Sequence, residues 1–514
     1  MEKYLFGIDV GTNETKGCLI KTNGEVVCSA KREHSLIIPA PGFAEHDPDG
    51  QWWADFVGII AELKSKAGIN ANQIVAVGVS TIMAAVTFLD EDNRPLRNAI
   101  LYGIDSRCSA QAKALNERIG KEKLKKVCKI EELNTESFGP KILWVKEHEP
   151  QVFEKTKHIT FASGYINARL TGNFAVDKYS VTSATPMINN NTYTWDEELT
   201  SYVCDKEMLP KVVNTSDVIG YVTKKAAEET GLAEGTPVIC GTTDAGAEAL
   251  SSGVACPGDT MIMYGSTAFL LHVMAPATVY NGKLWPTPYV VPKFDCICAG
   301  TSTAGSITKW LKNEFAKDLV EKEKRGELNA FDALFREAEN CPIGSDGLML
   351  LPYFMGQRMP SPNPNATGLM IGLTLRHTRG HVVRAAFEGI GYNIAEILSL
   401  LGPDFNSHKD NVRAIGGGTK TPLWLQIVSD ISNVTQTVPK VKLGASYGDA
   451  LLAGLGVGLV RDESAISAMV QTDYVIHPDQ KRHNQYLKYF DLFDRLYKTN
   501  QTLMSDILAV SQTI

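Results

Sequence analysis

The 514-residue sequence lacks the long apolar run that a membrane helix needs. Spanning a bilayer takes about 20 consecutive apolar residues, and no run approaches that length. Residues 1–5 lead straight into a strand pattern, without the apolar segment of a secretory signal. We therefore expect a cytoplasmic protein with no membrane partner.

Paired cysteines and an excess of basic residues are also missing. Of the 10 cysteines only Cys296 and Cys298 lie close together, so the C-x-x-C sets of a metal site are absent and reduced thiols are expected. Asp and Glu number 58 against 51 Lys and Arg, which gives a net charge of −7. A nucleic-acid-binding protein needs a basic face, so we expect no nucleic-acid partner.

Two common nucleotide-binding signatures are absent as well. The chain contains neither a Walker G-x-x-x-x-G-K-[ST] motif nor a Rossmann G-x-G-x-x-G after a strand. What it does contain is the composition of a globular protein, with 44% hydrophobic and 21% charged residues. The length is typical of roughly three domain-sized units.

The most informative stretch runs over residues 238–267. An apolar run ends in Gly-Thr-Thr-Asp244, the pattern of a strand that delivers one carboxylate to the start of a helix. Residues 245–252 are nearly all Ala, Gly, Leu and Ser, so we expect another element to pack closely on this helix. A second strand then enters the turn at residues 265–267, whose N–H groups and hydroxyls suit an anion. We predict that Asp244 removes a proton from a substrate hydroxyl while the turn holds the phosphates of ATP.

The N-terminus repeats this plan of strand, small-polar turn and strand. An apolar strand through Val10 enters a turn at residues 11–13, and a second strand follows through residues 16–20. Taken alone, this is a hairpin in which Asp9 stabilises the turn. The repetition favours two hairpins, one from each half of the chain, that hold a polyphosphate from two sides. Asp9 then lies near Mg²⁺ and binds it through water, because Mg²⁺ usually keeps several waters.

Further elements are expected on either side of these hairpins. Residues 74–80 and 86–89 are predicted to pair as strands, with Met83 and Ala84 at the mouth of the first. Asp105 either binds polyol hydroxyls or pairs with Arg107. In the second half, the small residues from 298 to 306 open a helix whose N–H groups suit a phosphate or ribose.

Two more patterns mark the second half of the chain. Residues 381–401 carry apolar side chains at spacings of three and four, as in a core helix. The strand at residues 412–415 ends in three glycines, which leave a flat backbone platform for a purine.

With these residues laid out, the chain resembles the FGGY family of carbohydrate kinases over essentially its whole length. The second family signature is matched at every constrained position. The match consists of residues 368–373 and residues 381–388, with seven residues between them. The first signature is matched more loosely, around residues 140–148. The resemblance implies an α/β fold with two actin-like (ribonuclease H-like) domains, each a five-stranded mixed sheet flanked by helices, which close over ATP and a sugar in the interdomain cleft.

The resemblance also implies the organisation and the chemistry. Residues 1–253 are expected to form the domain that binds sugar and carries the base, residues 254–478 the nucleotide-binding domain, and residues 479–514 terminal helices packed on the domains. The expected cofactors are ATP and Mg²⁺, and the expected partner is a small carbohydrate, with a homodimer as the assembly considered.

The predicted site combines the motifs with this resemblance. Asp244 is the base and contacts the substrate together with Met83, Ala84 and Asp105, and Asp9 is the Mg²⁺ residue. The residues predicted to contact the nucleotide are small or polar: Gly11, Thr12, Asn13, Lys16, Gly265, Ser266, Thr267, Thr301, Gly305, Gly416, Gly417, Gly418 and Thr419.

One departure leaves the substrate open. Xylulokinases of the family carry Met-His-Gly where this chain has Met83-Ala84-Ala85, and the usual Trp-Asn-Asp-x-Arg is altered at residues 102–107. The acceptor is a ketose such as a pentulose, a polyol, or a sugar acid such as gluconate. A non-catalytic actin-like nucleotide switch is another alternative, although Asp244 is retained. A serine hydrolase would use the G-x-S-x-G motif at residues 444–448, but that motif needs a strand directly before it.

Overall fold

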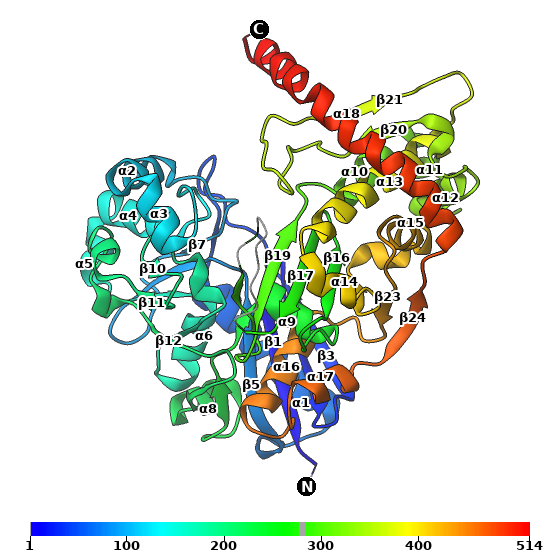
Figure 1. Ribbon diagram of the computed structural model, residues 1–514. Coiled ribbons are helices and arrows are strands. Elements are labelled where there is room, and N and C mark those ends of the chain that lie inside the picture. Colours follow the sequence, from blue (N-terminus) through cyan, green and yellow to red (C-terminus); the bar gives the residue numbers. More distant parts are fainter. Residues whose placement is uncertain (1, 277–283, 285, 514) are drawn as a thin grey trace. The chain divides into compact units, whose positions relative to one another are not determined.

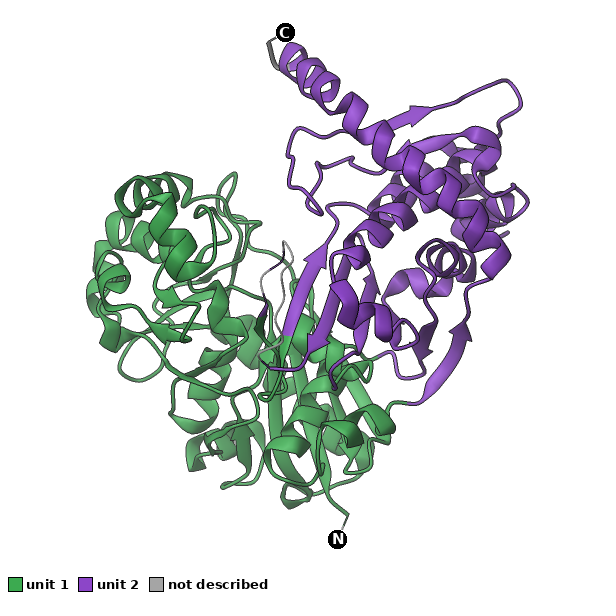
Figure 2. Ribbon diagram, in the orientation of Figure 1, with its two compact units in different colours: residues 1–255, 287–295, 443–470 green, residues 256–286, 296–442, 471–514 purple. Residues whose placement is uncertain are grey.

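The chain forms two compact units, each assembled from segments that are far apart in the sequence (Figure 2). The computed structural model describes residues 2–276, 284 and 286–513. Unit 1 comprises residues 1–255, 287–295 and 443–470, and unit 2 comprises residues 256–286, 296–442 and 471–514. Strands and helices alternate along both (Figure 1). Within the described residues, no helix has both the length and the apolar character of a membrane span.

A mixed sheet forms the centre of unit 1. Its strand order is β13-β14-β5-β1-β2-β3, with β15 beside β5. Strand β1 is antiparallel to β2 and parallel to β5. Both β1 and β5 are buried along nearly their whole length, as expected for central strands with covered faces. The bounds are β1 Tyr4–Val10, β2 Glu14–Lys21, β3 Val26–Glu33, β5 Ile74–Thr81, β13 Val218–Tyr221, β14 Pro237–Ile239 and β15 Thr242–Thr243.

Different helices cover the two faces of this sheet. Helix α1 (Ala54–Ala67) packs on one face and α16 (Ala445–Gly456) on the other. A β-carbon on Gly7 of β1 would lie 2.0 Å from the carbonyl oxygen of Ser446, so only glycine permits this approach of α16. Helix α9 (Asp244–Ser251) packs on α16 in turn. The close packing predicted for this small-residue helix is confirmed.

A second sheet in unit 1 corrects one prediction. Strand β6 (Val86–Leu89) was expected to pair with the strand at residues 74–80, and this is wrong. Both sides of β5 are occupied, by β1 on one and by β14 and β15 on the other, so β5 has no free edge. Strand β6 instead belongs to the sheet β4-β7-β6-β8, which has its own hydrophobic core. The elements around that core are β4 Glu45–His46, β7 Ala99–Ile100, β8 His158–Phe161, α2 Ser109–Ile119 and α4 Phe138–His148.

The central sheet of unit 2 repeats the plan of unit 1. Along β19-β17-β16-β22-β23-β24, strand β16 is antiparallel to β17 and parallel to β22, as β1 is to β2 and β5. Five strands therefore correspond between the units, and short edge strands such as β13 and β24 give each sheet more than the five strands predicted. The bounds are β16 Thr260–Tyr264, β17 Ala268–Met274, β19 Asp295–Gly300, β22 Val412–Ile415, β23 Gln436–Pro439 and β24 Thr472–Ile476.

The helices of unit 2 enclose its largest hydrophobic core. Helix α13 (Arg379–Ser399) is the core helix predicted at residues 381–401, and most of its residues are buried. The terminal residues form a single helix, α18 (Gln480–Thr513), where more than one terminal helix was expected. Unit 2 also contains the helices α10 Gly305–Phe315, α12 Ala330–Glu339, α14 Gly402–Ser407 and α15 Pro422–Ser432.

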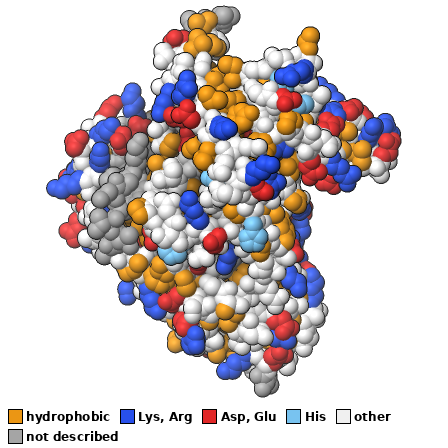
Figure 3. Space-filling model, turned by 45° about the vertical axis from the view of Figure 1, so that its right-hand side comes forward, with side chains coloured by type: hydrophobic (Ala, Val, Ile, Leu, Met, Phe, Trp, Pro, Cys, Tyr) orange, Lys and Arg blue, Asp and Glu red, His pale blue; other side chains and the backbone are white. Residues whose placement is uncertain are grey.

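Helix α18 is covered on one side only. Tyr486, Phe493 and Met504 are buried in the core of unit 2. Leu503, Ile507 and Val510 are 54%, 62% and 61% exposed. Figure 3 shows hydrophobic side chains gathered at the projecting end that carries the C-terminus. These three residues form the exposed stripe of α18.

Candidate active site

The turn between β1 and β2 leaves backbone donors free. A hydrogen bond of 3.0 Å from Gly11 N to Glu14 O closes the turn. Among the described residues, nothing accepts a hydrogen bond from the backbone N–H groups of Thr12 and Asn13. The Thr12 hydroxyl lies 2.9 Å from the Tyr102 hydroxyl. Free N–H groups in a tight turn form a concavity suited to an anion.

Carboxyl groups gather where β1 ends. Asp9 lies on β1, Asp244 begins α9, Glu248 follows one turn later, and Asp449 comes from α16. The Ser80 hydroxyl lies 3.0 Å from Asp9 Oδ1 and 2.7 Å from Asp449 Oδ2, so it links two of them. Asp9, Asp244 and Glu248 each keep part of their surface exposed. Asp449 is fully buried.

Burial and mutual repulsion raise the pKa values in this cluster. Burial, followed by the charge of Asp244, raises the pKa of Asp9 to about 8. Burial raises the pKa of Asp244 to about 6. Burial and then the charge of Asp244 raise the pKa of Glu248 to about 7. Lys16 opposes the shifts of Asp9 and Glu248. Because Lys16 is the one positive charge named beside these carboxyl groups, the cluster favours the binding of a cation.

The same repulsion predicts a stability effect. We expect Asp9→Asn to raise the melting temperature of the ligand-free protein at pH 8.5 by roughly 3 °C, and by less at pH 5. A carboxyl group whose pKa rises on folding stabilises the folded state only while it is protonated, and this stability is lost as pH rises toward the folded pKa of about 8. Calorimetry in EDTA at both pH values measures the difference.

The control is Asp92→Asn, which changes an exposed loop carboxylate of the same unit. It should give no gain that depends on pH. Equal gains for both variants, or no gain at pH 8.5, would contradict an unfavourable environment at Asp9.

Asp244 is held at the junction of β15 and α9. Thr242 and Thr243 pair with Ser80 and Thr81 of β5, and the Thr242 hydroxyl donates to buried Asp177 over 3.2 Å. Among the described residues, only the Ala245 N–H donates to the Asp244 carboxylate, over 2.7 Å. The second carboxylate oxygen is therefore available to an acceptor hydroxyl. The predicted strand end and helix start at Asp244 are confirmed.

The turn between β16 and β17 in unit 2 has the same construction. Gly265 N donates to Thr267 O over 3.0 Å, and nothing among the described residues accepts from Ser266 N or Thr267 N. The start of α10 stabilises the turn, because Gly305 N donates to Gly265 O over 3.0 Å. A β-carbon on Gly305 would lie 2.5 Å from that oxygen, so this position requires glycine.

A cavity of about 450 Å³ lies beside this turn. That volume falls in the range of small-molecule sites. Phe331, Phe335 and Trp424 supply aromatic walls, and Lys309 and Lys420 supply positive charge. Such a lining suits a flat base with phosphates attached. The predicted nucleotide residues that line the cavity are Gly265, Ser266, Gly305, Gly417 and Gly418.

Other predicted nucleotide residues lie behind this lining. Thr301 is 3% exposed, and its hydroxyl accepts from Ala268 N over 2.9 Å and so supports the β16–β17 turn. Thr419 is 6% exposed, and its hydroxyl donates to Gly416 O over 2.8 Å. Both threonines position the backbone around the cavity.

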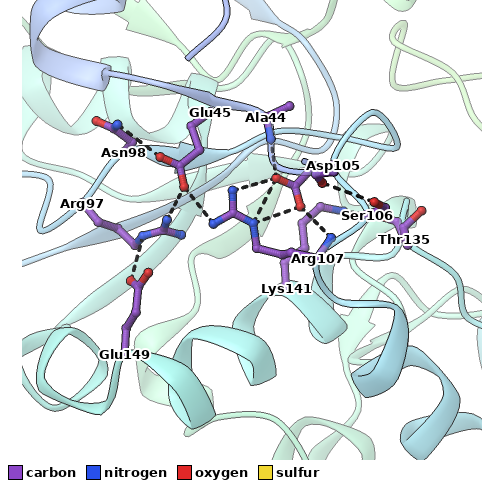
Figure 4. A network of polar contacts seen from close by, with 11 residues as sticks. Ala44, Glu45, Arg97, Asn98, Asp105, Ser106, Arg107, Thr135, Lys141 and Glu149 are labelled. Carbon is purple, nitrogen blue, oxygen red and sulfur yellow. Dashed lines mark hydrogen bonds and ion pairs between the residues drawn. The ribbon is translucent and has the colours of Figure 1, made fainter. Parts of the chain in front are cut away.

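On the predicted substrate side, Asp105 lies in a buried polar network (Figure 4). Its carboxylate accepts from the Arg107 guanidinium over 2.7 Å and from Ala44 N over 2.7 Å. Arg107 also pairs with Glu45 over 2.7 Å. The observed contacts are thus those of the pairing alternative. Met83 is half-buried, and its neighbour Ala84 is almost fully buried.

The serine hydrolase alternative is wrong. The G-x-S-x-G motif requires a strand that enters the serine turn directly. Strand β23 ends at Pro439, and Ser446 lies inside α16 with 1% of its surface exposed. A buried helical serine cannot serve as an exposed nucleophile.

Sequence reasoning missed several residues of the acidic cluster. Glu248 had a signal, since it lies four residues after Asp244 on a predicted helix and so shares its face. Ser80 and Asp449 are 369 residues apart and carry no local motif. No set of three or more His, Cys, Asp or Glu within the described chain could by itself hold a metal ion. A hydrated Mg²⁺ needs only one or two carboxylates.

Comparison with known proteins identifies the family. Residues 4–251 match the N-terminal domain of the FGGY family of carbohydrate kinases, and residues 260–457 match its C-terminal domain. The chain is 29% identical over 505 residues to a xylulose kinase of Bacillus subtilis (strain 168), covering 98% of both chains. It is 27% identical over 514 residues to a gluconokinase of the same strain, again covering 98% of both.

A solved structure agrees with this result. The crystal structure of xylulose kinase from Rhodospirillum rubrum aligns with a TM-score of 0.88 and 29% identity, covering 98% of this chain and 100% of that one. With both family domains present and the paired mixed sheets described above, the chain belongs to the FGGY family of carbohydrate kinases, which makes it an ATP-dependent enzyme that phosphorylates a small carbohydrate.

Proposed function

We propose that the protein transfers the γ-phosphoryl group of ATP to a hydroxyl of a ketose of the pentulose class, with Asp244 as general base. The observation that carries the proposal is the Asp244 carboxylate, which is partly exposed at the start of α9 and has a pKa of about 6. A base with this pKa is mostly ionised at pH 7.5, yet lies near enough to the working pH for efficient proton transfer. The likeness to xylulose kinases supports a ketose.

Each protein group has a defined task in this reaction. As the acceptor oxygen forms its bond to the γ-phosphorus, Asp244 takes up the hydroxyl proton, and the bond to the β,γ-bridging oxygen breaks to release ADP. The free N–H groups of Thr12, Asn13, Ser266 and Thr267 bind phosphate oxygens, and Lys16 neutralises part of their charge.

The acidic cluster fits the expected Mg²⁺ ion. Asp9 and Glu248 have raised pKa values, with Lys16 as the opposing charge and the Ser80 hydroxyl as a further opposing contact of Asp9, and a cation would relieve this environment. We propose that Asp9 holds the ion through water. When bound, Mg²⁺ supplies charge neutralisation to the phosphates.

In the proposed mechanism, the two units bind different substrates. Unit 1 carries Asp244 and binds the carbohydrate, with Met83 and Ala84 at the strand mouth as part of the pocket wall. Asp105 acts there through its contact with the Ala44 backbone. Unit 2 binds the nucleotide base in the cavity between Phe331 and Trp424.

A sugar acid such as gluconate is the second candidate substrate. The gluconokinase of Bacillus subtilis matches as much of this chain as the xylulose kinase does, at 27% against 29% identity. The side chains at Met83-Ala84-Ala85 also lack the imidazole that the family's xylulokinases place there.

A coupled assay of ADP release distinguishes these candidates. The panel contains D-xylulose, other pentuloses, polyols and gluconate, each with Mg²⁺ and ATP. The highest kcat/KM for a ketose supports the main proposal, and the highest value for gluconate supports the second. ADP release that no carbohydrate accelerates would contradict both.

Two further proposals concern the whole protein. Its proposed location is the cytoplasm, in accord with the reduced thiols expected from the composition. Its proposed assembly is a homodimer formed by the exposed stripe of α18. Leu503, Ile507 and Val510 follow one helix face at spacings of four and three, and Asp506 is the one charged residue among residues 499–514. A second copy offers the same apolar stripe.

We therefore expect light scattering to give twice the 56.1 kDa mass of one chain. Ile507→Glu should halve the measured mass, because it places a charge in the contact. Leu487→Glu is the matched control, since Leu487 is 48% exposed on α18 but lies outside the stripe, and it should leave the mass unchanged. A wild-type protein that is monomeric at micromolar concentration would exclude this assembly.

A further inference from the structure

The two proposed phosphate-binding turns differ in the groups that donate hydrogen bonds to their backbone carbonyls. In unit 2 the carbonyl groups of Gly265 and Ser266 accept hydrogen bonds from the backbone N–H groups of Gly305 and Ala304, over 3.0 and 2.8 Å. These carbonyl dipoles are thereby turned away from the ligand side, and the N–H groups of the turn stay available. Both donors belong to the start of α10, the helix that follows β19.

Unit 1 differs at the corresponding place, because the described residues 34–44 form no helix. The strand that corresponds to β19 is β3, and the chain leaves it through an irregular loop that begins at His34. The His34 side chain supplies the missing donor, because its Nε2 lies 3.1 Å from Gly11 O. Its backbone N–H also donates to Asn13 O over 3.0 Å. One residue therefore holds two carbonyl groups of the turn.

Both ring nitrogens of His34 have hydrogen-bond partners. Its Nδ1 lies 3.0 Å from Asp55 Oδ2, and the Thr15 hydroxyl donates to the same oxygen over 2.8 Å. Gly11 O can only accept a hydrogen bond, so His34 Nε2 carries a proton, and a further proton lies between Nδ1 and Asp55. The side chain is 4% exposed, so the ring is buried beneath the turn.

The neighbouring His46 is neutral. Its ring lies edge-on to that of His34, with the centroids 4.8 Å apart. The Trp52 indole N–H donates to His46 Nδ1 over 3.0 Å, so that nitrogen is unprotonated. Burial, and then the charge of His34, lower the pKa of His46 to about 4. It is the His34 ring that donates to Gly11 O.

We propose that His34 is a positioning residue for the nucleotide. It keeps the Gly11 and Asn13 carbonyls turned inward, so that the Thr12 and Asn13 N–H groups face the phosphates. In unit 1 His34 donates hydrogen bonds to the carbonyl groups of the turn, as the start of α10 does in unit 2. The inference rests on the proposed function only in taking the ligand to be a nucleoside polyphosphate with Mg²⁺.

The test is His34→Gln, which cannot donate to Gly11 O and Asp55 together. We expect the KM for ATP to rise about tenfold, which corresponds to about 1.4 kcal/mol. We expect kcat to change less than about threefold and the KM for the carbohydrate to stay unchanged. A purely structural role would lower the amount of active enzyme without this split between KM and kcat.

The matched control is His272→Gln. His272 is fully buried in unit 2 and pairs with Asp404 over 3.0 Å, so the substitution removes a similar imidazole–carboxylate pair that lies away from both turns. It should leave the KM for ATP unchanged. An equal rise in KM for the two variants would overturn the inference, and so would an unchanged KM in folded His34→Gln.

A measurement on the wild-type protein covers the case in which His34→Gln does not fold. NMR of protein labelled with ¹⁵N-histidine should show that Nε2 of His34 is protonated at pH 7.5, and a His34 ring with an unprotonated Nε2 would overturn the inference. Calorimetric binding of ADP with Mg²⁺ separates this proposal from the proposed reaction. If the wild type binds ADP about tenfold tighter than His34→Gln yet phosphorylates no carbohydrate, the proposed function fails and the role of His34 stands.

Discussion

Asp244→Asn is expected to lower kcat by about 10²–10⁴-fold, the range that a general base contributes, and to leave the KM for ATP nearly unchanged. The amide keeps the shape of the carboxylate and its contact with the Ala245 N–H. It cannot accept the proton of the attacking hydroxyl. Steady-state kinetics with saturating carbohydrate and varied ATP separate the two constants.

The control for this prediction is Glu248→Gln, which removes the neighbouring charge of the cluster without removing the base. It should lower kcat much less than Asp244→Asn. In the wild type, kcat should also fall as the pH drops through about 6, where Asp244 takes up a proton and can no longer accept one. Near-normal turnover by Asp244→Asn would show that another group is the base.

Gly448→Ala is expected to have the largest effect on stability. A β-carbon at Gly448 would lie 1.8 Å from the Ala247 carbonyl oxygen and 3.1 Å from Ser251 N. Both contacts are to the backbone of α9, so no flexible side chain can move aside. Overpacking typically costs about 1–3 kcal/mol and occasionally more, and this outweighs the roughly 1 kcal/mol by which alanine favours a helix. We expect a net loss of about 2 kcal/mol, measured by urea unfolding.

Gly58→Ala is the matched control, because Gly58 also lies inside a helix of unit 1. A β-carbon there would have its nearest neighbour at 3.4 Å, the Nε atom at the end of the flexible Arg32 side chain. Helix propensity should then dominate, and the free energy of unfolding should stay the same or rise by up to about 1 kcal/mol. If Gly448→Ala proved as stable as Gly58→Ala, α9 and α16 would not be in the close contact described.

The parts of this structure that depend on local pattern were predictable from the sequence. Both hairpins follow from apolar runs separated by small polar turns, and the core helix α13 follows from the 3.6-residue period of its apolar residues. The placement of Asp244 follows from the same logic, since a strand that ends in Gly-Thr-Thr-Asp delivers the carboxylate to a helix start. Each of these features is determined by residues within about 20 positions of one another.

The parts that depend on distant contacts were not predictable. The partners of β5 include β14, which comes more than 150 residues later, and β6 looked like a partner because it came next in the chain. His34 and Asp55 belong to no motif, and their role appears only where β3 ends behind the Gly11 turn. Asp449 directly follows the G-x-S-x-G sequence of residues 444–448, which suggested an unrelated chemistry, whereas its carboxyl group contacts Ser80, 369 residues earlier in the chain.

The return of residues 443–470 to unit 1 has a consequence for biosynthesis. Strands β1 and β5 leave the ribosome early, but α16, which covers their glycine-bearing face, is synthesised only after most of unit 2. Until then the nascent chain exposes Gly7, Gly78 and the apolar residues beside them. A fragment that stops at residue 255 would keep this face uncovered permanently, so it should need a chaperone to remain in solution, and adding a peptide of residues 443–470 in trans should relieve that need.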